Sequence, residues 1–319
     1  MYYQTTSPVL FIIFNRPDTT RLIFDEIKKA RPAKLYIAAD GPREDREGEN
    51  VLCSLSRSII EQIDWDCQVS SLYQIKNLGC KNAVASAIDW FFEKEDEGII
   101  LEDDCLPANE FFRFCDTLLT KYRYDSRIRH IGGCNLQSGI KRGDASYYFS
   151  NMTHVWGWAS WKRAWIAYDR ELSNYNINDV PTQLGKIFSE PLIIETWTNI
   201  FMQVKNKEVD TWDYQLTFTN FFNNGLSAMP NVNLITNIGF RQDATHTKLT
   251  DSNANIPLGT LDSKITHPLY FLPDKEADTY TLTIDFLINE RKAELERKNK
   301  WLRRTFKRWL SSIKKAVAN

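Results

Sequence analysis

The stretch Gly98-Ile99-Ile100-Leu101-Glu102-Asp103-Asp104-Cys105-Leu106-Pro107 decides the fold. A short apolar run leads directly into three carboxylates, and a proline closes the segment. Among alternating strands and helices, this order predicts a buried parallel strand whose carboxyl end opens into an acidic loop, where open sheets of this class bind ligands. Because three adjacent acids repel one another, a bound cation would stabilise them. Their oxygen atoms suit Mg²⁺ or Mn²⁺ beside a phosphate-rich substrate.

Earlier segments of the chain repeat the pattern of an apolar strand followed by a helix. The motifs Asn15-Arg16-Pro17 and Asp40-Gly41-Pro42 stop the first two strands. Four such units in about 100 residues predict right-handed crossovers and a largely parallel sheet. The predicted strands are 9–14, 35–39, 68–73 and 99–101, and the intervening helices carry Leu22–Ile27, Leu52–Ile63 and residues 81–92.

The pattern changes after Glu110, and three regions are predicted. Residues 1–130 form the β/α half of one domain, and residues 131–280 form a mixed α+β half that is rich in Trp, Tyr and Asn and packs on the same sheet. A basic amphipathic helix occupies residues 281–319, with its clearest helical pattern over 283–317. The polar, turn-rich segment 249–278 is predicted to be a loop or linker.

Charge is distributed unevenly along the chain. The net charge of −1 argues against a nucleic-acid partner, but residues 291–315 hold eleven Lys or Arg against two Glu, so the remainder carries about −10. One stripe of this helix is apolar, and two tryptophans lie among the basic residues, which favours a helix on an anionic membrane surface. Packing on the protein body and binding of a partner protein remain alternatives. The stripe comprises Leu302, Phe306, Trp309, Leu310, Ile313 and Val317.

Cysteine spacing and the amino terminus bear on the compartment. The six cysteines include no CxxC pair, and residues 1–8 show no basic region followed by a long apolar stretch. We therefore expect free thiols in a cytoplasmic protein, peripheral at the inner membrane face if the basic helix binds lipid.

Several nucleotide-binding signatures are missing from the sequence. No GxGxxG motif follows a strand, which argues against a Rossmann dehydrogenase, and no GxxxxGK[ST] motif is present. The first strand ends in Asn15-Arg16-Pro17 and lacks the glycine-rich loop of sugar-phosphate nucleotidylyltransferases. These absences leave the acidic strand end as the main chemical feature.

The remaining landmarks resemble a glycosyltransferase of the GT-A fold. In order, they are the Asn15-Arg16 loop, Asp40-Gly41-Pro42, Asn77-Leu78-Gly79 at the start of a helix, and Glu102-Asp103-Asp104 in place of a DxD-type motif. Their spacing is similar to that of glycosyltransferase family 2. The Glu-Asp-Asp form is more similar to the Golgi N-acetylglucosaminyltransferases that initiate complex N-glycans. Gly157-Trp158, Trp212-Asp213 and the segment 231–240 extend the resemblance over about residues 8–248.

This resemblance implies a Rossmann-like α/β fold, with a mostly parallel sheet and helices on both faces. It also implies metal-dependent transfer of a sugar from a nucleoside-diphosphate donor, such as a UDP-sugar, to a glycan or glycolipid acceptor. Asp213 would be the general base of an inverting transfer, and Asp104 and His246 would be metal ligands for Mn²⁺ or Mg²⁺. Contacts to the nucleotide-sugar would come from Asn15, Arg16, Asp40, Lys81, Glu102 and Asp103, and the acceptor or sugar subsite from His154, Trp156, Gly157 and Trp158.

Each role has a plainer alternative. Asp213 could cap a helix, and Asp40 could belong to an ordinary Asp-Gly turn. Tryptophans serve core packing as often as sugar stacking, and a lone histidine is more often structural. Tyr214 stands where the resembled family has a second acid, which leaves the acceptor open. A non-catalytic protein that binds carbohydrate or nucleotide on the same fold is the alternative function.

Overall fold

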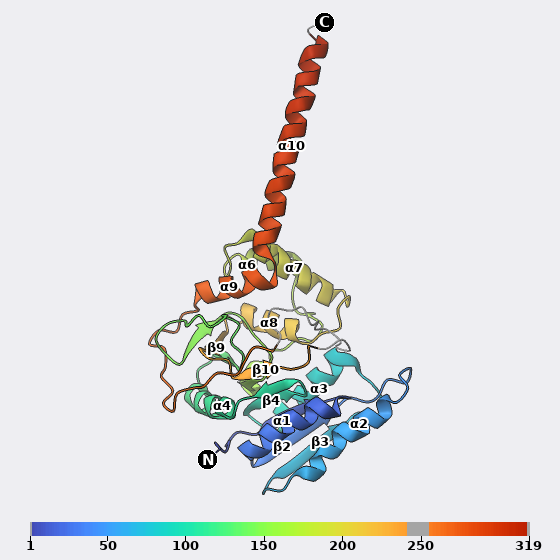
Figure 1. Ribbon diagram of the computed structural model, residues 1–319, viewed down its shortest axis with the longest axis vertical. Helices are drawn as coiled ribbons and strands as arrows, with labels where there is room; N and C mark the ends of the chain where they lie inside the picture. Colours follow the sequence, from blue (N-terminus) through green and yellow to red (C-terminus); the bar gives the residue numbers. More distant parts are fainter. Residues whose placement is uncertain (1, 241–254, 318–319) are drawn as a thin grey trace.

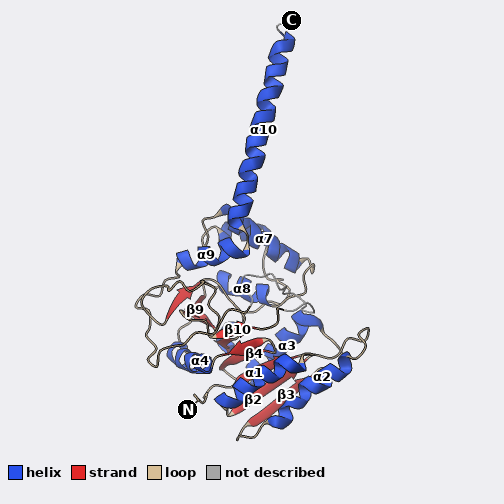
Figure 2. Cartoon of the chain, in the orientation of Figure 1, coloured by secondary structure: helices blue, strands red, loops and turns tan. Residues whose placement is uncertain are grey.

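A computed structural model describes residues 2–240 and 255–317 (Figure 1). Within these ranges, eight strands form one sheet in the order β3-β2-β1-β4-β8-β6-β9-β7. The pairs among β3, β2, β1 and β4 are parallel, as predicted, because each strand is followed by a helix that returns the chain to the same edge. The predicted α/β class with a mostly parallel sheet is confirmed (Figure 2).

Strand and helix bounds in the first half are close to those predicted. The strands are β1 (Val9–Ile13), β2 (Lys34–Ala39), β3 (Gln68–Tyr73), β4 (Glu97–Glu102), β5 (Cys105–Pro107) and β6 (Ile128–Gly132). The helices are α1 (Pro17–Ala30), α2 (Glu49–Arg57), the 3₁₀ segment η1 (Ser58–Gln62), α3 (Gly79–Lys94) and α4 (Asn109–Tyr122).

The second half completes the sheet and adds a group of helices. Its strands are β7 (Tyr147–Ser150), β8 (Trp158–Trp161), β9 (Leu226–Pro230) and β10 (Ile235–Asn237). Its helical segments are α5 (Lys162–Trp165), η2 (Ile177–Asp179), α6 (Val180–Leu184), α7 (Pro191–Lys205), α8 (Asp213–Phe222), α9 (Lys275–Asp285) and α10 (Ile288–Val317). Strand β8 runs antiparallel between β4 and β6, so both halves share one sheet.

Helices cover both faces of this sheet because the strands are apolar on both faces. On one face, Val9, Phe11 and Ile13 pack against α1 and α4. On the other face, Leu10 and Ile12 pack against α3 and the Trp-rich segments. A further apolar cluster joins α6, α7, α8 and α9. Strands buried on both faces are typical of parallel sheets, so the continuous apolar runs were informative.

The carboxyl-terminal region differs from the single predicted helix. The chain turns at Leu287, whose φ of 50° lies in the left-handed region, so α9 and α10 are separate. Helix α9 packs on β7 and ends at Asp285. Helix α10 projects from the body of the protein (Figure 1). No glycine or proline marks this left-handed turn in the sequence. The pattern of 283–317 therefore predicted one continuous helix.

Candidate active site

The carboxyl ends of the parallel strands bring the acidic loop beside the loop after β1. Ile12 is the register partner of Glu102, so the residues that follow each strand leave the sheet side by side. Asp103 accepts a 2.9 Å hydrogen bond from the Phe14 backbone N–H. The acidic motif is therefore held directly next to Asn15 and Arg16, which the sequence had placed in one site on separate grounds.

Arg16 joins both aspartates of the motif. Its Nη1 atom lies 2.8 Å from Asp104 Oδ2 and 3.9 Å from Asp103 Oδ1. The side chains of Arg16 and Asp104 are 21% and 20% exposed, so the pair reaches the surface rather than lying in the core. The guanidinium supplies positive charge at the place where a cation was expected.

The backbone of residues 238 and 239 closes the other side of Asp104. Strand β10 pairs antiparallel with β5, and the Ile238 N–H donates a 2.8 Å hydrogen bond to the Asp104 carbonyl. Gly239 approaches so closely that a Cβ atom at its position would stand 2.2 Å from Asp104 Oδ2. Asp104 is thus confined between Arg16 and the backbone of Gly239.

Burial and mutual repulsion disturb the titration of this motif. Burial raises the pKa of Glu102 well above its usual range, and the charges of Asp104 and Asp103 add to the shift. Burial and the charge of Asp104 raise the pKa of Asp103 to about 7, against the opposing effect of Arg16. Burial and repulsion therefore disfavour the ionised form of these carboxyl groups, and nearby positive charge would favour it.

The donor set fits a hard divalent cation that is held chiefly by substrate oxygens. Among residues 2–240 and 255–317, no three His, Cys, Asp or Glu side chains converge as a complete protein metal site. Mg²⁺ commonly takes only one or two protein carboxylates, with phosphates and water completing its shell. Asp104 can supply such a carboxylate. His246, the other predicted ligand, lies outside the described residues.

Asp213 stands at the start of α8 and faces the same acidic region. Its charge contributes to the raised pKa of Glu102, and both acids act on Cys80 in the first turn of α3. The Thr211 hydroxyl donates to the Asp213 carboxylate, and the neighbouring Trp212 indole stacks on Trp158 with 5.9 Å between ring centroids. These contacts position the start of α8. Asp213 is the first residue of this helix, and Trp212, not Asp213, stands at its N-cap.

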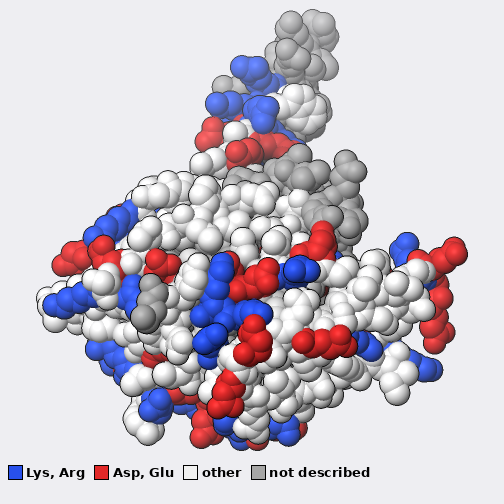
Figure 3. Space-filling view, turned by 60° about the horizontal axis from the view of Figure 1, so that its bottom comes forward, with Lys and Arg blue, Asp and Glu red and all other residues white. Residues whose placement is uncertain are grey.

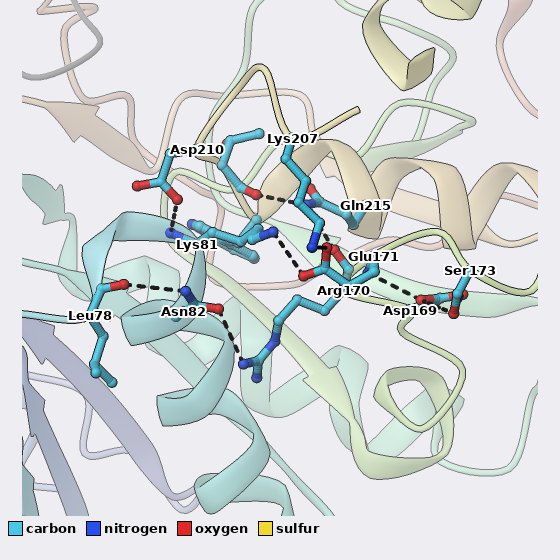
Figure 4. A network of polar contacts seen from close by, with 12 residues as sticks. Leu78, Lys81, Asn82, Asp169, Arg170, Glu171, Ser173, Lys207, Asp210 and Gln215 are labelled. Atoms are coloured by element: carbon cyan, nitrogen blue, oxygen red, sulfur yellow. Dashed lines mark hydrogen bonds and ion pairs between the residues drawn. The ribbon is translucent and has the colours of Figure 1, made fainter. Parts of the chain in front are cut away.

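A network of charged side chains ties this region to the amino terminus of α3 (Figure 4). Lys81 Nζ lies 2.8 Å from Glu171 Oε1, and Lys207 approaches the other oxygen of Glu171 at 3.5 Å. The Lys81 backbone N–H donates to Asp210 Oδ1 at 3.3 Å. Lys81 is therefore not an isolated surface charge: it links α3 to the segment that leads into Asp213. Its predicted contact with a nucleotide-sugar remains a prediction.

Asp40 joins the loop after β2 to the segment before α3. Its carboxylate accepts hydrogen bonds from the Gly41 and Leu78 backbone N–H groups and from Asn77 Nδ2, each at 2.8–2.9 Å. Burial raises the pKa of Asp40, and the Leu78 and Gly41 N–H donors oppose that shift. The structure thus gives Asp40 a clear role in loop geometry, while its predicted contact with a nucleoside remains a prediction.

Asn15 has partners that the sequence did not reveal. Its Nδ2 donates a 2.9 Å hydrogen bond to the buried Glu49, which also pairs with Arg43. Glu49 follows a charged, turn-rich stretch of sequence. The residue types there do not distinguish a buried acid from an exposed one, so the sequence did not identify Glu49. A surface cavity of about 290 Å³ borders Arg43, between the 42–50 loop and residues 75–76. Neither Asn15 nor any residue of the acidic motif lines this cavity.

The predicted sugar subsite separates into core and non-core residues. Trp158 is only 1% exposed and stacks on His130 and Trp212, as its core-packing alternative predicted. Its contact with a sugar remains a prediction. Gly157 adopts a φ of 58°, and a Cβ there would meet Ile235 at 2.5 Å, which explains the glycine by close packing. Trp156 is half-buried and meets Phe240 edge-on, next to Gly239.

His154 shares the environment of the buried aromatic cluster. Burial lowers its pKa to about 4, so its ring is neutral at ordinary pH. Its neighbour His130 is fully buried, and burial lowers the pKa of His130 to about 3. A neutral ring can donate or accept a hydrogen bond, so the predicted contact of His154 with a sugar or acceptor remains a prediction.

Comparisons with known proteins give limited similarity. No protein-family model and no curated protein matches the sequence. A UDP-glucose pyrophosphorylase complexed with UDP-glucose shares 13% identity over 46% of this chain, with a TM-score of 0.27, and the match spans 62% of that enzyme. A 4-diphosphocytidyl-2C-methyl-D-erythritol synthase from Anaerococcus prevotii DSM 20548 shares 13% identity over 58% of this chain and 85% of its own, with a TM-score of 0.33. HddC from Yersinia pseudotuberculosis shares 10% identity over 50% and 78% of the two chains, with a TM-score of 0.30. These values describe partial similarity of chain trace and assign no activity, so the resemblance to glycosyltransferases remains a prediction.

Proposed function

We propose that this protein is a metal-dependent glycosyltransferase that moves a sugar from a nucleoside-diphosphate donor to a glycan or lipid-linked acceptor. The observation that carries the proposal is the placement of Asp103 and Asp104 at the carboxyl end of β4, where Arg16 Nη1 lies 3.9 Å and 2.8 Å from their carboxylates. The charge of Asp213 also acts on this motif, through Glu102. This edge of a parallel sheet is the usual ligand site of open α/β folds. A UDP-sugar is the first donor to test.

Asp104 would hold Mn²⁺ or Mg²⁺, and the cation would neutralise charge on the departing nucleoside diphosphate. Arg16 would pair with the diphosphate, since a guanidinium matches phosphate oxygens with two parallel hydrogen bonds. Asp103 accepts a hydrogen bond from the Phe14 N–H and would contact the nucleotide. These residues bind and orient the donor without any covalent step on the protein.

Asp213 would remove the proton from the acceptor hydroxyl as its oxygen attacks the anomeric carbon. The bond between the anomeric carbon and the diphosphate oxygen breaks as the new glycosidic bond forms, and Asp213 keeps the proton. Direct displacement of this kind inverts the anomeric configuration. Thr211 supports the role because its hydroxyl orients the Asp213 carboxylate.

The test is Mn²⁺-dependent hydrolysis of UDP-, GDP-, CMP- and dTDP-sugars by the full chain, with Asp104→Asn as the key variant. Wild type should release nucleotide from at least one donor, and Asp104→Asn should lose about 100-fold or more of that rate with its melting temperature unchanged. The exposed Asp144 provides a matched control, because Asp144→Asn removes the same charge far from β4. Tight nucleotide binding without turnover of any donor would instead support a non-catalytic binding protein.

We further propose that α10 brings the enzyme to an anionic membrane surface, where lipid-linked acceptors are found. Within its described side chains, Trp301, Leu302 and Phe306 are 64%, 55% and 58% exposed, and Lys and Arg gather on the same stretch (Figure 3). Arg291 and Lys292 instead pair with Glu195 and Glu190, which ties the start of the helix to α7. None of the described helices is long and apolar enough to cross a bilayer.

Vesicle sedimentation tests this surface. The full chain should sediment with phosphatidylglycerol vesicles but not with phosphatidylcholine vesicles. Its binding should weaken as the salt concentration rises. The double variant Arg303→Glu/Arg304→Glu should lose at least tenfold in binding, about 1 kcal/mol for each charge near the surface. The variant Lys141→Glu/Lys264→Glu changes charge equally on the body and should bind like wild type. Equal loss in both double variants would show that net charge, and not α10, accounts for binding.

A further inference from the structure

The contact between Arg16 and Asp104 occupies the carboxylate that the proposed cation needs. Arg16 Nη1 lies 2.8 Å from Asp104 Oδ2, while Oδ1 accepts a weak hydrogen bond from the Cys105 thiol at 3.4 Å. A divalent cation on this carboxylate would stand within a few ångströms of the guanidinium. Like charges at that separation repel strongly where both are partly shielded from water. The cation and Arg16 therefore compete for Asp104.

The Arg16 side chain would have to move to resolve this competition, because the backbone around it is held in place. Pro17 begins α1 directly after it, and the Thr20 N–H donates a 2.9 Å hydrogen bond to the Arg16 carbonyl. Phe14 and Asn15 are held by Asp103 and Glu49 on the preceding side. The backbone is thus held on both sides, whereas the side chain is 21% exposed, so a ligand at the surface can reach it.

We propose that Arg16 is an exchangeable counter-ion, which releases Asp104 to the divalent cation and moves to the donor diphosphate when cation and nucleotide bind together. This inference rests on the proposed function, because it requires a cation at Asp104. A diphosphate carries enough negative charge for both the cation and the guanidinium. Its arrival removes the repulsion that the cation meets when it binds alone.

The exchange predicts thermodynamic coupling between metal and nucleotide. In wild type the cation binds weakly alone, since it must displace Arg16, and more tightly once nucleotide has drawn Arg16 away. Linkage requires that the cation strengthen nucleotide binding by the same factor. Removing the guanidinium should therefore have opposite effects on the two ligands: tighter binding of the metal alone and weaker binding of the nucleotide. A residue that only supports the fold would weaken both.

The experiment is calorimetric titration of the full chain with Mn²⁺ alone, and then with UDP in saturating Mn²⁺. Arg16→Gln should bind Mn²⁺ about three- to tenfold more tightly than wild type, the range expected for loss of a partly exposed competing ion pair. The same variant should bind UDP about tenfold more weakly. Arg16→Lys keeps the charge, so its Mn²⁺ affinity should stay near that of wild type.

Arg123→Gln is the matched control because Arg123 pairs with Glu97 at 2.6 Å, at the opposite end of the same strand β4. It removes an arginine–carboxylate pair of the same kind and should leave Mn²⁺ binding unchanged. Equal Mn²⁺ affinity in wild type and Arg16→Gln would overturn the exchange while leaving the proposed function intact. Absence of Mn²⁺ binding in every variant would overturn both together. Unchanged UDP affinity in Arg16→Gln would overturn the transfer of Arg16 to the diphosphate.

Discussion

Gly239 and Asp104 touch across the junction of β5 and β10, with space for a hydrogen atom but not for a methyl group. A Cβ at residue 239 would lie 2.2 Å from Asp104 Oδ2 and 2.8 Å from its Cγ, so the carboxylate would have to move. The side chain that the proposed cation needs is thus aimed by the backbone of a segment more than a hundred residues away in sequence.

Gly239→Ala should displace the Asp104 carboxylate and weaken Mn²⁺ binding about tenfold, at a stability cost of about 1–3 kcal/mol typical of overpacking. Calorimetry and urea denaturation measure the two effects. Gly185→Ala is the control, because a Cβ there meets its nearest neighbour, the Thr182 carbonyl, at an ordinary 3.4 Å. Wild-type metal affinity in Gly239→Ala would show that Asp104 does not hold the cation.

Asp213→Asn preserves size and the hydrogen bond from Thr211 but removes the base. Turnover should fall by about 100- to 10,000-fold, the usual contribution of a positioned base, while calorimetry shows unchanged donor binding. Asp179→Asn changes an exposed acid by the same isosteric step and should leave turnover unchanged. If Asp213→Asn lowered donor affinity as much as it lowered turnover, Asp213 would act in binding or in helix capping and not as the base.

Asp40→Ala should destabilise the loops before α3, because three donors lose a buried acceptor. The free energy of unfolding should fall by about 2–3 kcal/mol, as for hydrogen bonds to a charged group. Urea denaturation tests this against Asp45→Ala, which removes an exposed acid from the same loop and should change stability little. A stable Asp40→Ala protein that has lost nucleotide binding would favour the nucleoside role instead.

His130 should make stability depend on pH. Burial lowers the pKa of His130 from 6.5 to about 3, so the unfolded chain binds a proton between those values and the folded chain does not. Its contribution is present above pH 6.5 and is lost as pH falls towards 3, by about 2 kcal/mol at pH 5. His130→Phe keeps the ring stacked on Trp158 and should flatten this slope in urea titrations at pH 7 and 5. The exposed His267→Gln should alter the slope much less, and an unchanged slope in His130→Phe would assign it to other groups.

The parallel half of the fold could be predicted from the sequence because its strands are continuous apolar runs with clear stops. Gly98 to Leu101 is buried on both faces, and Asn15-Arg16-Pro17 ends β1 where predicted. The aromatic half was harder to predict, since Trp158 fits a binding face and a core equally well in sequence. Only the position of β8 between β4 and β6 buries it.

The sequence predicted which residues belong to the candidate site, but not which side chains contact one another. The sequence placed Arg16 and Asp104 in one site because both follow parallel strands, but their ion pair depends on side-chain positions that no spacing encodes. The partnership of Asn15 with Glu49 and the contact of Gly239 with Asp104 join distant segments in the same way. The break at Leu287 was missed because no glycine or proline marks it.

The most direct test of the central claim is manganese anomalous scattering from crystals soaked with Mn²⁺ and a donor that the hydrolysis panel identifies. We predict an anomalous peak in contact with an Asp104 carboxylate oxygen, with the donor diphosphate on its other side. A donor bound elsewhere, or a manganese peak away from the end of β4 with Asp104 still paired to Arg16, would contradict the account.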